Sequence, residues 1–390
     1  MNISIEEWYR NFSPDCDYVI WGCSDFAEQL IRSLGDCLKI SYLVDKSPDK
    51  DGTVYCGYPV RSPKVLEQDR KKKIIISNTY MGTRRKIMND LTAMGYVCDV
   101  DFTFVEQVLS IYNWKIRNQI VSQYVEISIT TACTLRCKNC TAYMPYVNKR
   151  IHIPLQELFE STDSYFGCID YVGRFRILGG EPLLHPNLVE YINYIGEKYR
   201  DRIGELCIVT NGTIPISDDL MQVIKKNKVT LFVSNYSKSG HPLATPDRYN
   251  VFLQKLDRED IRYYFSNDQK WLDLGLPVKE EFSDEVLRER FSDCRHYCRS
   301  IVSNRLFMCA TWAFAVLGGI YTEDWSQFKG NGIIDLPRLS KKSPEERFEE
   351  WFRFDISMDA LQDGFLDFCR YCKGFGSRNT NFVEVGEQIK

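Results

Sequence analysis

The sequence has few histidines, no long apolar run and almost no net charge. Only four of its 390 residues are histidine, and it contains no His-Glu-x-x-His motif, Walker loop or Ser/His/Asp arrangement. No apolar stretch approaches the roughly 20 residues of a membrane span, and the first residues are amphipathic and acidic rather than a signal peptide. With 50 basic and 53 acidic residues, the net charge is −3. We therefore expect neither nucleic acid nor a membrane as partner.

Cysteine, in contrast, is abundant. Fifteen cysteines in a chain without a visible export signal predict thiols that are kept reduced, and hence a cytoplasmic protein. About half of them gather in short motifs, which favours metal binding over disulfide bonds. Hydrophobic residues make up 44% of the chain, so 390 residues can build two domains and part of a third.

The first 110 residues alternate strand-like and helix-like segments. An apolar run ends at Gly22, a helical pattern follows, and a second strand ends at Asp45. This alternation predicts a parallel, Rossmann-like sheet. Ser24 stands where a dinucleotide fingerprint has a glycine, although Asp45 lies where an acid would bind ribose hydroxyls. We predict scaffolding, partner docking or binding of a nucleotide-linked substrate before NAD binding, in a domain of residues 1–110 that a helix at 111–122 connects onward.

A compact cysteine loop, TACTLRCKNCTAYMPY, follows the strand-like run YVEISIT. Three and then two residues separate Cys133, Cys137 and Cys140. Three thiolates can hold three irons of a [4Fe–4S] cube and leave the fourth iron open to a small ligand. By spacing alone, three structural thiols or an incomplete zinc knuckle are the alternatives.

Polar and glycine residues end the strands that come after this loop. The next strand breaks into Gly179, Gly180 and Glu181, where glycines allow close approach of a ligand and the carboxylate can accept hydrogen bonds from an ammonium group. Two later strands end near Asn211 and Ser234. Because carboxyl ends of parallel strands share one edge, we expect these residues to share the site of the cysteine loop.

A second cysteine set lies between residues 290 and 375. Residues 298–309 predict a hairpin that turns at Ser303–Asn304. A later Cys-x-x-Cys brings the set to five members: Cys294, Cys298, Cys309, Cys369 and Cys372. Four thiolates close one metal site, and spacing alone favours a structural zinc ribbon.

The cysteine loop, GGEP and the following LLHPNL resemble the radical S-adenosylmethionine (SAM) superfamily. The resemblance implies an α/β fold with a partial (β/α)6 TIM-type barrel at 123–285, in which WLDLG at 271–275 completes the strand pattern. It implies a cluster on the loop and SAM on its open iron. SAM-binding roles then fall to Gly179, Gly180, Glu181, Asn211 and Ser234. The family usually has an aromatic residue where this chain has Asn139, so the Asn139 amide or the Tyr143 ring is expected at the adenine.

The second set resembles the auxiliary-cluster domain, called twitch in its short form and SPASM in its longer form, that follows such cores. This implies a domain of residues 286–390 and a second [4Fe–4S] cluster. Its implied ligands are Cys309, Cys369, Cys372 and either Cys294 or Cys298. The fifth cysteine is then structural or a hydrogen donor, which makes Cys298 the candidate catalytic residue, with Cys207 as another possible donor.

The expected activity is cleavage of SAM to a 5′-deoxyadenosyl radical, which abstracts hydrogen from a C–H bond. The N-terminal stretch resembles Rossmann-like domains associated with nucleotide sugars, which favours oxidation or epimerisation of a sugar, aminocyclitol or nucleotide-sugar. The expected reductant is of the flavodoxin or ferredoxin type. Modification of a peptide side chain is the alternative, and a binding module with purely structural clusters is a third reading that GGEP and Ser234 argue against.

Overall fold

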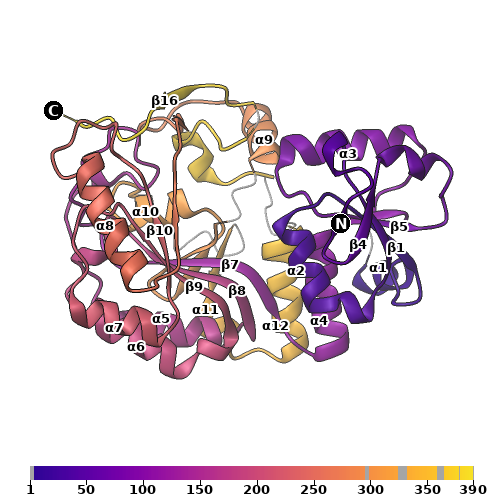
Figure 1. Cartoon of the computed structure of the whole chain (residues 1–390), viewed down its shortest axis with the longest axis horizontal. Coiled ribbons are helices and arrows are strands. Elements are labelled where there is room, and N and C mark those ends of the chain that lie inside the picture. The colour runs from indigo at the N-terminus through magenta and orange to yellow at the C-terminus, as the bar shows by residue number, and fades with distance from the viewer. Residues whose placement is uncertain (1–3, 295–297, 324–331, 358–363, 377, 390) are drawn as a thin grey trace. The chain divides into compact units, whose positions relative to one another are not determined.

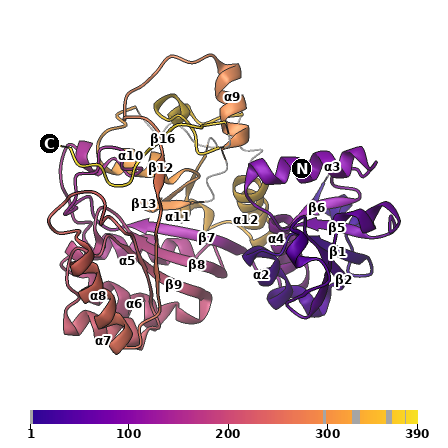
Figure 2. The same cartoon turned by 45° about the horizontal axis from the view of Figure 1, so that its top comes forward.

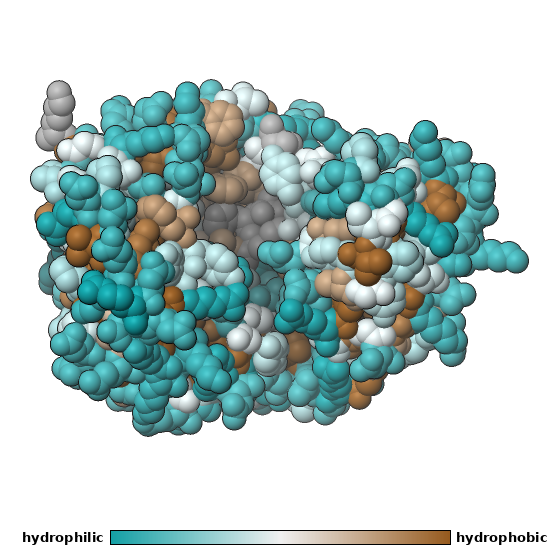
Figure 3. Space-filling model, viewed as in Figure 1, coloured by the Kyte–Doolittle hydropathy of each residue, from teal (hydrophilic) through white to brown (hydrophobic). Residues whose placement is uncertain are grey.

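The computed structural model describes residues 4–294, 298–323, 332–357, 364–376 and 378–389. It divides into two compact units, residues 1–119 and 120–390. Within the described residues, no helix is both long and apolar enough to cross a membrane. The face of the molecule in Figure 3 is mostly hydrophilic, with hydrophobic side chains scattered over it.

The first unit is built on a six-stranded sheet, in the order β3-β4-β2-β1-β5-β6. All neighbouring strands pair in parallel except β3 and β4, as expected for alternating strands and helices. The strands are β1 (Asp17–Trp21), β2 (Lys39–Val44), β3 (Val54–Tyr55), β4 (Tyr58–Arg61), β5 (Lys73–Ile76) and β6 (Phe102–Phe104). The helices are α1 (Ile5–Asn11), α2 (Asp25–Leu34), α3 (Met81–Ala93) and α4 (Val105–Arg117).

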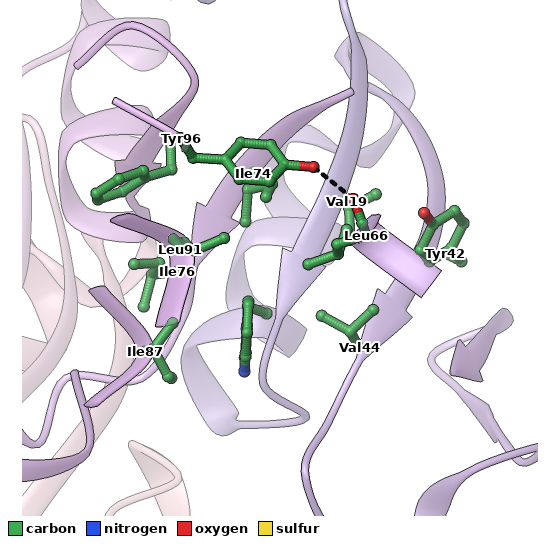
Figure 4. Packing of buried hydrophobic residues seen from close by; sticks show 11 residues of the cluster. Val19, Tyr42, Val44, Leu66, Ile74, Ile76, Ile87, Leu91 and Tyr96 are labelled. Atoms are coloured by element: carbon green, nitrogen blue, oxygen red, sulfur yellow. Dashed lines mark hydrogen bonds between the residues drawn. The ribbon is translucent and has the colours of Figure 1, made fainter. Parts of the chain in front are cut away.

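The core of this unit packs side chains of the central strands against α3 and the segment after it. In Figure 4, Ile74 of β5 lies next to the ring of Tyr96, and Ile76 of the same strand lies next to Leu91. The Tyr96 hydroxyl donates a hydrogen bond of 2.9 Å to the carbonyl of Leu66, so this buried phenol is satisfied inside the core.

The predicted nucleotide-binding turn is filled by its own chain. Gly22 has φ +111°, and a Cβ there would lie 2.8 Å from Oγ of Ser77. Ser24 caps α2 by accepting from the N–H of Ala27. The Asp45 carboxylate accepts from the N–H of Cys23 at 3.0 Å and from Lys50 at 3.1 Å. Asp45 therefore stabilises the turn, and binding of a nucleotide here stays a prediction.

The helix predicted to connect two domains at 111–122 ends earlier: residues 111–117 are the end of α4, which packs inside the first unit, and residues 121 and 122 begin a strand, β7 (Val121–Ser128). Its Tyr112 hydroxyl donates to the carbonyl of Phe12 at 2.8 Å and lies 3.0 Å from the hydroxyl of Tyr18. Asn118 ends the helix in the left-handed conformation, just before the division between the units.

The second unit is organised around an eight-stranded sheet, in the order β11-β10-β9-β8-β7-β13-β14-β15. Strands β7 to β11 and β13 are parallel, which is consistent with a radical SAM type of partial barrel. These strands are β7 (Val121–Ser128), β8 (Tyr171–Leu178), β9 (Ile203–Thr210), β10 (Thr230–Val233), β11 (Tyr263–Phe265), β13 (Ser300–Val302), β14 (Arg305–Phe307) and β15 (Ile333–Asp335). The helices are α5 (Leu155–Phe166), α6 (Leu188–Lys198), α7 (Asp218–Lys226), α8 (Pro246–Arg258), α9 (Asp284–Asp293), α10 (Ala310–Leu317), α11 (Leu336–Leu339) and α12 (Pro344–Phe352).

The sixth parallel strand is β13, and the expectation for residues 271–275 was wrong. That segment forms β12 (Lys270–Leu272), which pairs antiparallel with β16 (Phe382–Glu384) outside the main sheet. The predicted hairpin is confirmed: β13 and β14 pair antiparallel around Ser303 and Asn304, with φ of 47° and 61°. Because β13 also pairs with β7, the cysteine-rich region is joined to the barrel sheet itself.

The two faces of this sheet have different neighbours. Helices α5 to α8 cover one face, and α10 lies with the β12–β16 pair on the other (Figures 1 and 2). Phe175 of β8 packs against Tyr165 and Phe166 of α5. Residues alternate between faces along a strand, so Arg176 points to the α10 face.

Candidate functional site

The cysteine loop leaves the carboxyl end of β7 and packs directly on the GGEP segment at the end of β8. A Cβ on Gly179 would lie 2.4 Å from the carbonyl oxygen of Thr130, and one on Gly180 would lie 2.2 Å from that of Ala132. The N–H of Gly180 donates to Thr130 at 2.8 Å. The close approach that these glycines permit is thus to the cysteine loop itself, rather than only to a ligand as expected.

Glu181 is fully buried, and its carboxylate is held by protein donors. It accepts from the hydroxyl of Thr210 at 2.8 Å and from the N–H groups of Asn211 at 2.7 Å and Leu183 at 3.0 Å. Burial raises its pKa from 4.5 to about 7, against the opposing effect of these hydrogen bonds. Its side chain fixes the ends of β8 and β9 together, and the expected contact with an ammonium group stays a prediction.

The two polar strand ends face the loop in different ways. The Asn211 amide donates to Oγ1 of Thr134 at 2.9 Å and lies 3.6 Å from the sulfur of Cys133. Ser234 follows β10, and its N–H donates to the carbonyl of Thr210 at 2.9 Å. Its hydroxyl bonds to none of the residues that the structure describes, so it has a free donor at this edge of the sheet.

A remote segment also closes on the cysteine loop. The Gln388 amide donates to the sulfur of Cys137 at 3.3 Å and its oxygen accepts from the N–H of Arg136 at 2.7 Å. The N–H of Lys138 donates to Glu387 at 2.7 Å. No local pattern marks Gln388 in the sequence, because its role exists only once this segment folds over the loop.

An aromatic residue that sequence reasoning missed lies beside the three thiols. Burial raises the pKa of Tyr236, and the nearby Cys133, Cys137 and Cys140 raise it further. The centre of its ring lies 5.6 Å from that of Trp271 in an edge contact. Asn139, in contrast, donates to Asp273 at 3.3 Å. The signal in the sequence is the place of Tyr236 three residues past the end of β10, the strand that Ser234 follows.

Tyr143 connects the two cysteine groups. Its N–H donates to the carbonyl of Cys140 at 2.9 Å, and its hydroxyl donates to the carbonyl of Tyr371 at 3.4 Å. Tyr371 lies between Cys369 and Cys372 in the later Cys-x-x-Cys. The ring is buried, so Tyr143 fits a bridge between the groups better than a free surface for adenine.

The second group gathers around one small cavity at the end of α9. Its walls include Phe291, Met308 and Phe368, so the setting is largely apolar. The cysteines lining it are Cys294, Cys309, Cys369 and Cys372. Backbone N–H groups already point at two of the sulfurs: Gly374 to Cys372 at 3.3 Å and Phe375 to Cys294 at 3.2 Å. Such N–H···S bonds accompany iron–sulfur ligation.

Cys298 lies apart from this cavity. It packs in a hydrophobic cluster with Cys133 and Cys140 of the loop and with Phe314 of α10. Burial raises its pKa to about 12, so it keeps its proton at neutral pH. Of the two predicted alternatives for the fourth ligand, the structure favours Cys294 over Cys298.

Burial also raises the pKa of each loop thiol, to about 12 for Cys133 and Cys137. Thiolates there need the positive charge of bound iron. Among the described residues, no group of His, Cys, Asp or Glu converges as ligands of a single ion would. A [4Fe–4S] cube binds each thiolate at a different iron, so its ligands need no common point, and the donor set of three soft sulfurs fits such a cluster.

His185, next to GGEP, has a structural position. Its Nε2 lies 2.9 Å from the carbonyl of Ile153, and its Nδ1 accepts from the N–H of Asn187 at 3.2 Å. The side chain is buried, and both ring nitrogens are engaged by the backbone.

Residues 127–278 match the family model described as the Radical SAM superfamily. The chain contains a radical SAM domain. The matched range holds the cysteine loop, GGEP and both polar strand ends. The radical SAM family uses a [4Fe–4S] cluster and SAM, so both are cofactors of this protein.

Curated relatives of the radical SAM domain carry the name GTP 3',8-cyclase. The protein of Ectopseudomonas mendocina (strain ymp) is 36% identical over 149 residues, which cover 37% of this chain and 38% of the relative. That of Alkaliphilus oremlandii (strain OhILAs) is 37% identical over 161 residues, which cover 40% and 45%. The chain thus spans less than half the length of these relatives.

Solved structures also align with the chain. BtrN in complex with AdoMet and 2-DOIA aligns with a TM-score of 0.40 and 15% identity, over 69% of this chain and 97% of BtrN. The anSMEcpe enzyme with bound AdoMet and Kp18Cys peptide aligns with a TM-score of 0.41 and 14% identity, over 69% and 92%.

Proposed function

We propose that this protein is a radical SAM enzyme with two [4Fe–4S] clusters that oxidises or epimerises a sugar-like small molecule, such as a nucleotide-sugar. The observation that supports it best is the packing of two separate cysteine groups in one compact unit, bridged by Tyr143. When bound, SAM and the clusters would supply two things: a radical that removes a hydrogen atom from the substrate, and a route for single electrons. The chain's residues supply binding, orientation and exclusion of water.

In this proposal, the first cluster is held by Cys133, Cys137 and Cys140, with SAM beside Gly179, Gly180, Asn211, Ser234 and Tyr236. Glu181 holds the GGEP segment in place through its hydrogen bonds to Thr210, Asn211 and Leu183. The second cluster is held by Cys294, Cys309, Cys369 and Cys372. The Arg290 guanidinium supports the last two ligands by donating to the carbonyl of Cys369 at 3.2 Å and that of Cys372 at 2.6 Å.

Cys298 is the candidate hydrogen donor for an epimerisation. Its S–H bond would break as the hydrogen atom moves to a substrate carbon radical, leaving a sulfur radical. A flavodoxin- or ferredoxin-type reductant would then return one electron, and solvent one proton. The raised pKa supports this role, because the thiol rather than the thiolate carries the hydrogen.

The substrate class rests on two supports. The relatives are named for GTP, a phosphorylated ribonucleoside, and the first unit has the parallel sheet that its resemblance to nucleotide-sugar domains implied. Radical SAM enzymes that modify peptides often begin with a winged-helix domain that binds the leader peptide. The parallel sheet of the first unit differs from such a domain, which makes the peptide-modifying alternative the weaker one.

The test is formation of 5′-deoxyadenosine by reconstituted, reduced protein with SAM. Cys137→Ala should abolish it and leave about four of about eight irons per chain. Cys56→Ala, which removes an exposed thiol of the first unit, is the matched control. No 5′-deoxyadenosine from the wild type would refute the proposal, and about four irons with one zinc would refute the second cluster.

A further inference from the structure

A group of polar side chains lies on the α10 face of the barrel sheet and has no role in binding the clusters. Strand register puts Glu126 of β7 beside Arg176 of β8 on one side and Ser300 of β13 on the other. Ser128 follows on the same face, two residues nearer the cysteine loop. The group therefore lies directly below the carboxyl edge where the first cluster is expected.

Three buried polar atoms in this group lack any partner. They are Nε of Arg176, Oγ of Ser128 and Oγ of Ser300, which bond to nothing among the described residues. Ser300 is completely buried and Ser128 nearly so. Each unsatisfied buried group costs about 1–3 kcal/mol, so three of them on one face indicate a ligand that supplies their partners.

Arg176 is held in place by aromatic rings that leave its N–H groups free. Its guanidinium carbon lies 4.5 Å from the ring centre of Phe232 and 5.1 Å from that of Tyr124. Stacking engages the π-faces, whereas the planar fork of N–H donors suits a carboxylate or a phosphate. No ion pair to Arg176 is formed within the part of the chain that the structure describes.

The nearest acid neutralises Arg176 only weakly. Glu126 is almost completely buried, and its carboxylate accepts a hydrogen bond of 2.8 Å from the hydroxyl of Tyr124. Burial raises its pKa to about 7, so a large share of it is uncharged near neutral pH. Arg176 thus keeps a net positive field, while Glu126 offers a hydrogen-bonding group to a hydroxyl.

We propose that these residues form the substrate site, in which Arg176 binds an oxyanion of the substrate and Glu126, Ser128 and Ser300 bind its hydroxyl groups. This inference rests on the proposed function and deepens it: the substrate is a hydroxylated small molecule with a carboxylate or phosphate. Cys298, two residues before Ser300 and on the same face, then lies beside the bound carbon skeleton.

Calorimetry tests this with the holoenzyme under anaerobic conditions in the presence of SAM. Glucose 1-phosphate, glucuronate and glucose serve as probes. We expect at least one anionic probe to bind ten times more tightly than glucose, because a charge-assisted hydrogen bond to the partly buried Arg176 guanidinium is worth about 1.5–3 kcal/mol. A preference for the phosphate or for the carboxylate probe identifies which oxyanion the site takes.

Arg176→Gln should lower the affinity for the anionic probe at least tenfold and leave the affinity for glucose unchanged. Arg174→Gln is the matched control: Arg174 lies on the same strand and face, but it is paired with Glu205 at 2.7 Å. If Arg176→Gln does not fold, Arg176→Lys replaces it. Loss of the planar guanidinium should still lower the affinity for the anionic probe severalfold.

The inference is overturned if the wild type binds the anions no better than glucose or not at all, or if the Arg176 variants bind like the wild type. The proposed function is tested separately, by 5′-deoxyadenosine made without any substrate. If 5′-deoxyadenosine forms but calorimetry shows no preference for the anionic probes, only this inference is refuted. If no 5′-deoxyadenosine forms, the proposed function is refuted, whatever the calorimetry shows.

Discussion

The two cysteine groups of the second unit have similar settings but different construction. The first group spans eight residues, from Cys133 to Cys140, and leaves a single strand end. The second spans residues 294–372 and comes from α9, the end of β14 and a later turn. The cysteines of both groups are partly buried, apart from the buried Cys137, and burial raises the pKa of cysteines in each group. The ligands of a short loop are fixed by spacing, whereas those of a dispersed group are fixed only by packing.

The largest expected effect separates Cys294 from Cys298. Cys294→Ala should lower the iron content from about eight to about four per chain, because it removes one of four ligands of the second cluster. Cys298→Ala should keep all the iron, because Cys298 packs near the first group and away from the second cavity. Iron analysis after reconstitution measures both.

Retention of iron in Cys294→Ala together with loss in Cys298→Ala would reverse the assignment. A variant of Cys168, a buried cysteine whose thiol donates to Leu336, controls for the loss of a buried thiol. Its iron content should match the wild type.

The next effect compares the two buried glutamates, both with a pKa of about 7. At pH 5, Glu126→Gln should change the free energy of unfolding by less than about 1 kcal/mol, because an amide resembles the uncharged acid and can still accept from Tyr124. Glu181→Gln should cost about 1–3 kcal/mol, because its NH₂ group would face an N–H donor where the carboxylate accepted three bonds. Urea unfolding measures both.

The pH dependence follows from the direction of the Glu126 shift. Folding raises this pKa from 4.5 to about 7, so the folded state holds the proton more tightly. The resulting stabilisation is complete below pH 4.5 and is lost as the pH rises through about 7. Relative to Glu126→Gln, the wild type should lose up to about 3 kcal/mol between pH 5 and pH 8. A parallel pH dependence in the two proteins would contradict this.

The smallest effect concerns the hydrogen bonds to sulfur. Gln388→Ala removes the N–H···S bond to Cys137, which leaves more negative charge on the thiolate and lowers the reduction potential of the first cluster. A bond worth about 1 kcal/mol corresponds to about 40 mV for one electron. A redox titration followed by electron paramagnetic resonance measures it.

Glu387→Gln is the control, because the Glu387 side chain pairs with Lys138 at the surface and does not contact the sulfur. An unchanged potential in Gln388→Ala would show that the segment closes on the loop without affecting the cluster.

Much of this architecture could be predicted where the signal was local. The hairpin at Ser303–Asn304 was predicted because Asn304, which tolerates a left-handed backbone, stands with Ser303 between apolar runs. The sixth barrel strand was misplaced because WLDLG and the short apolar run of β13 look alike, and only pairing with β7 or with β16 distinguishes them. Tyr236 and Gln388 were missed, since no spacing ties them to the cysteine loop.

The sequence by itself determined the radical SAM domain, because the cysteine spacing and GGEP are short motifs whose chemistry follows from neighbouring residues. It also predicted two separate groups of cysteines. The tertiary structure decided which cysteines form each group and that GGEP packs against the cysteine loop. It also decided that Arg176 of β8 lies beside Glu126 of the adjacent strand β7. Those relations depend on strand register and on which face each residue takes, and both are settled only when distant segments pack against one another.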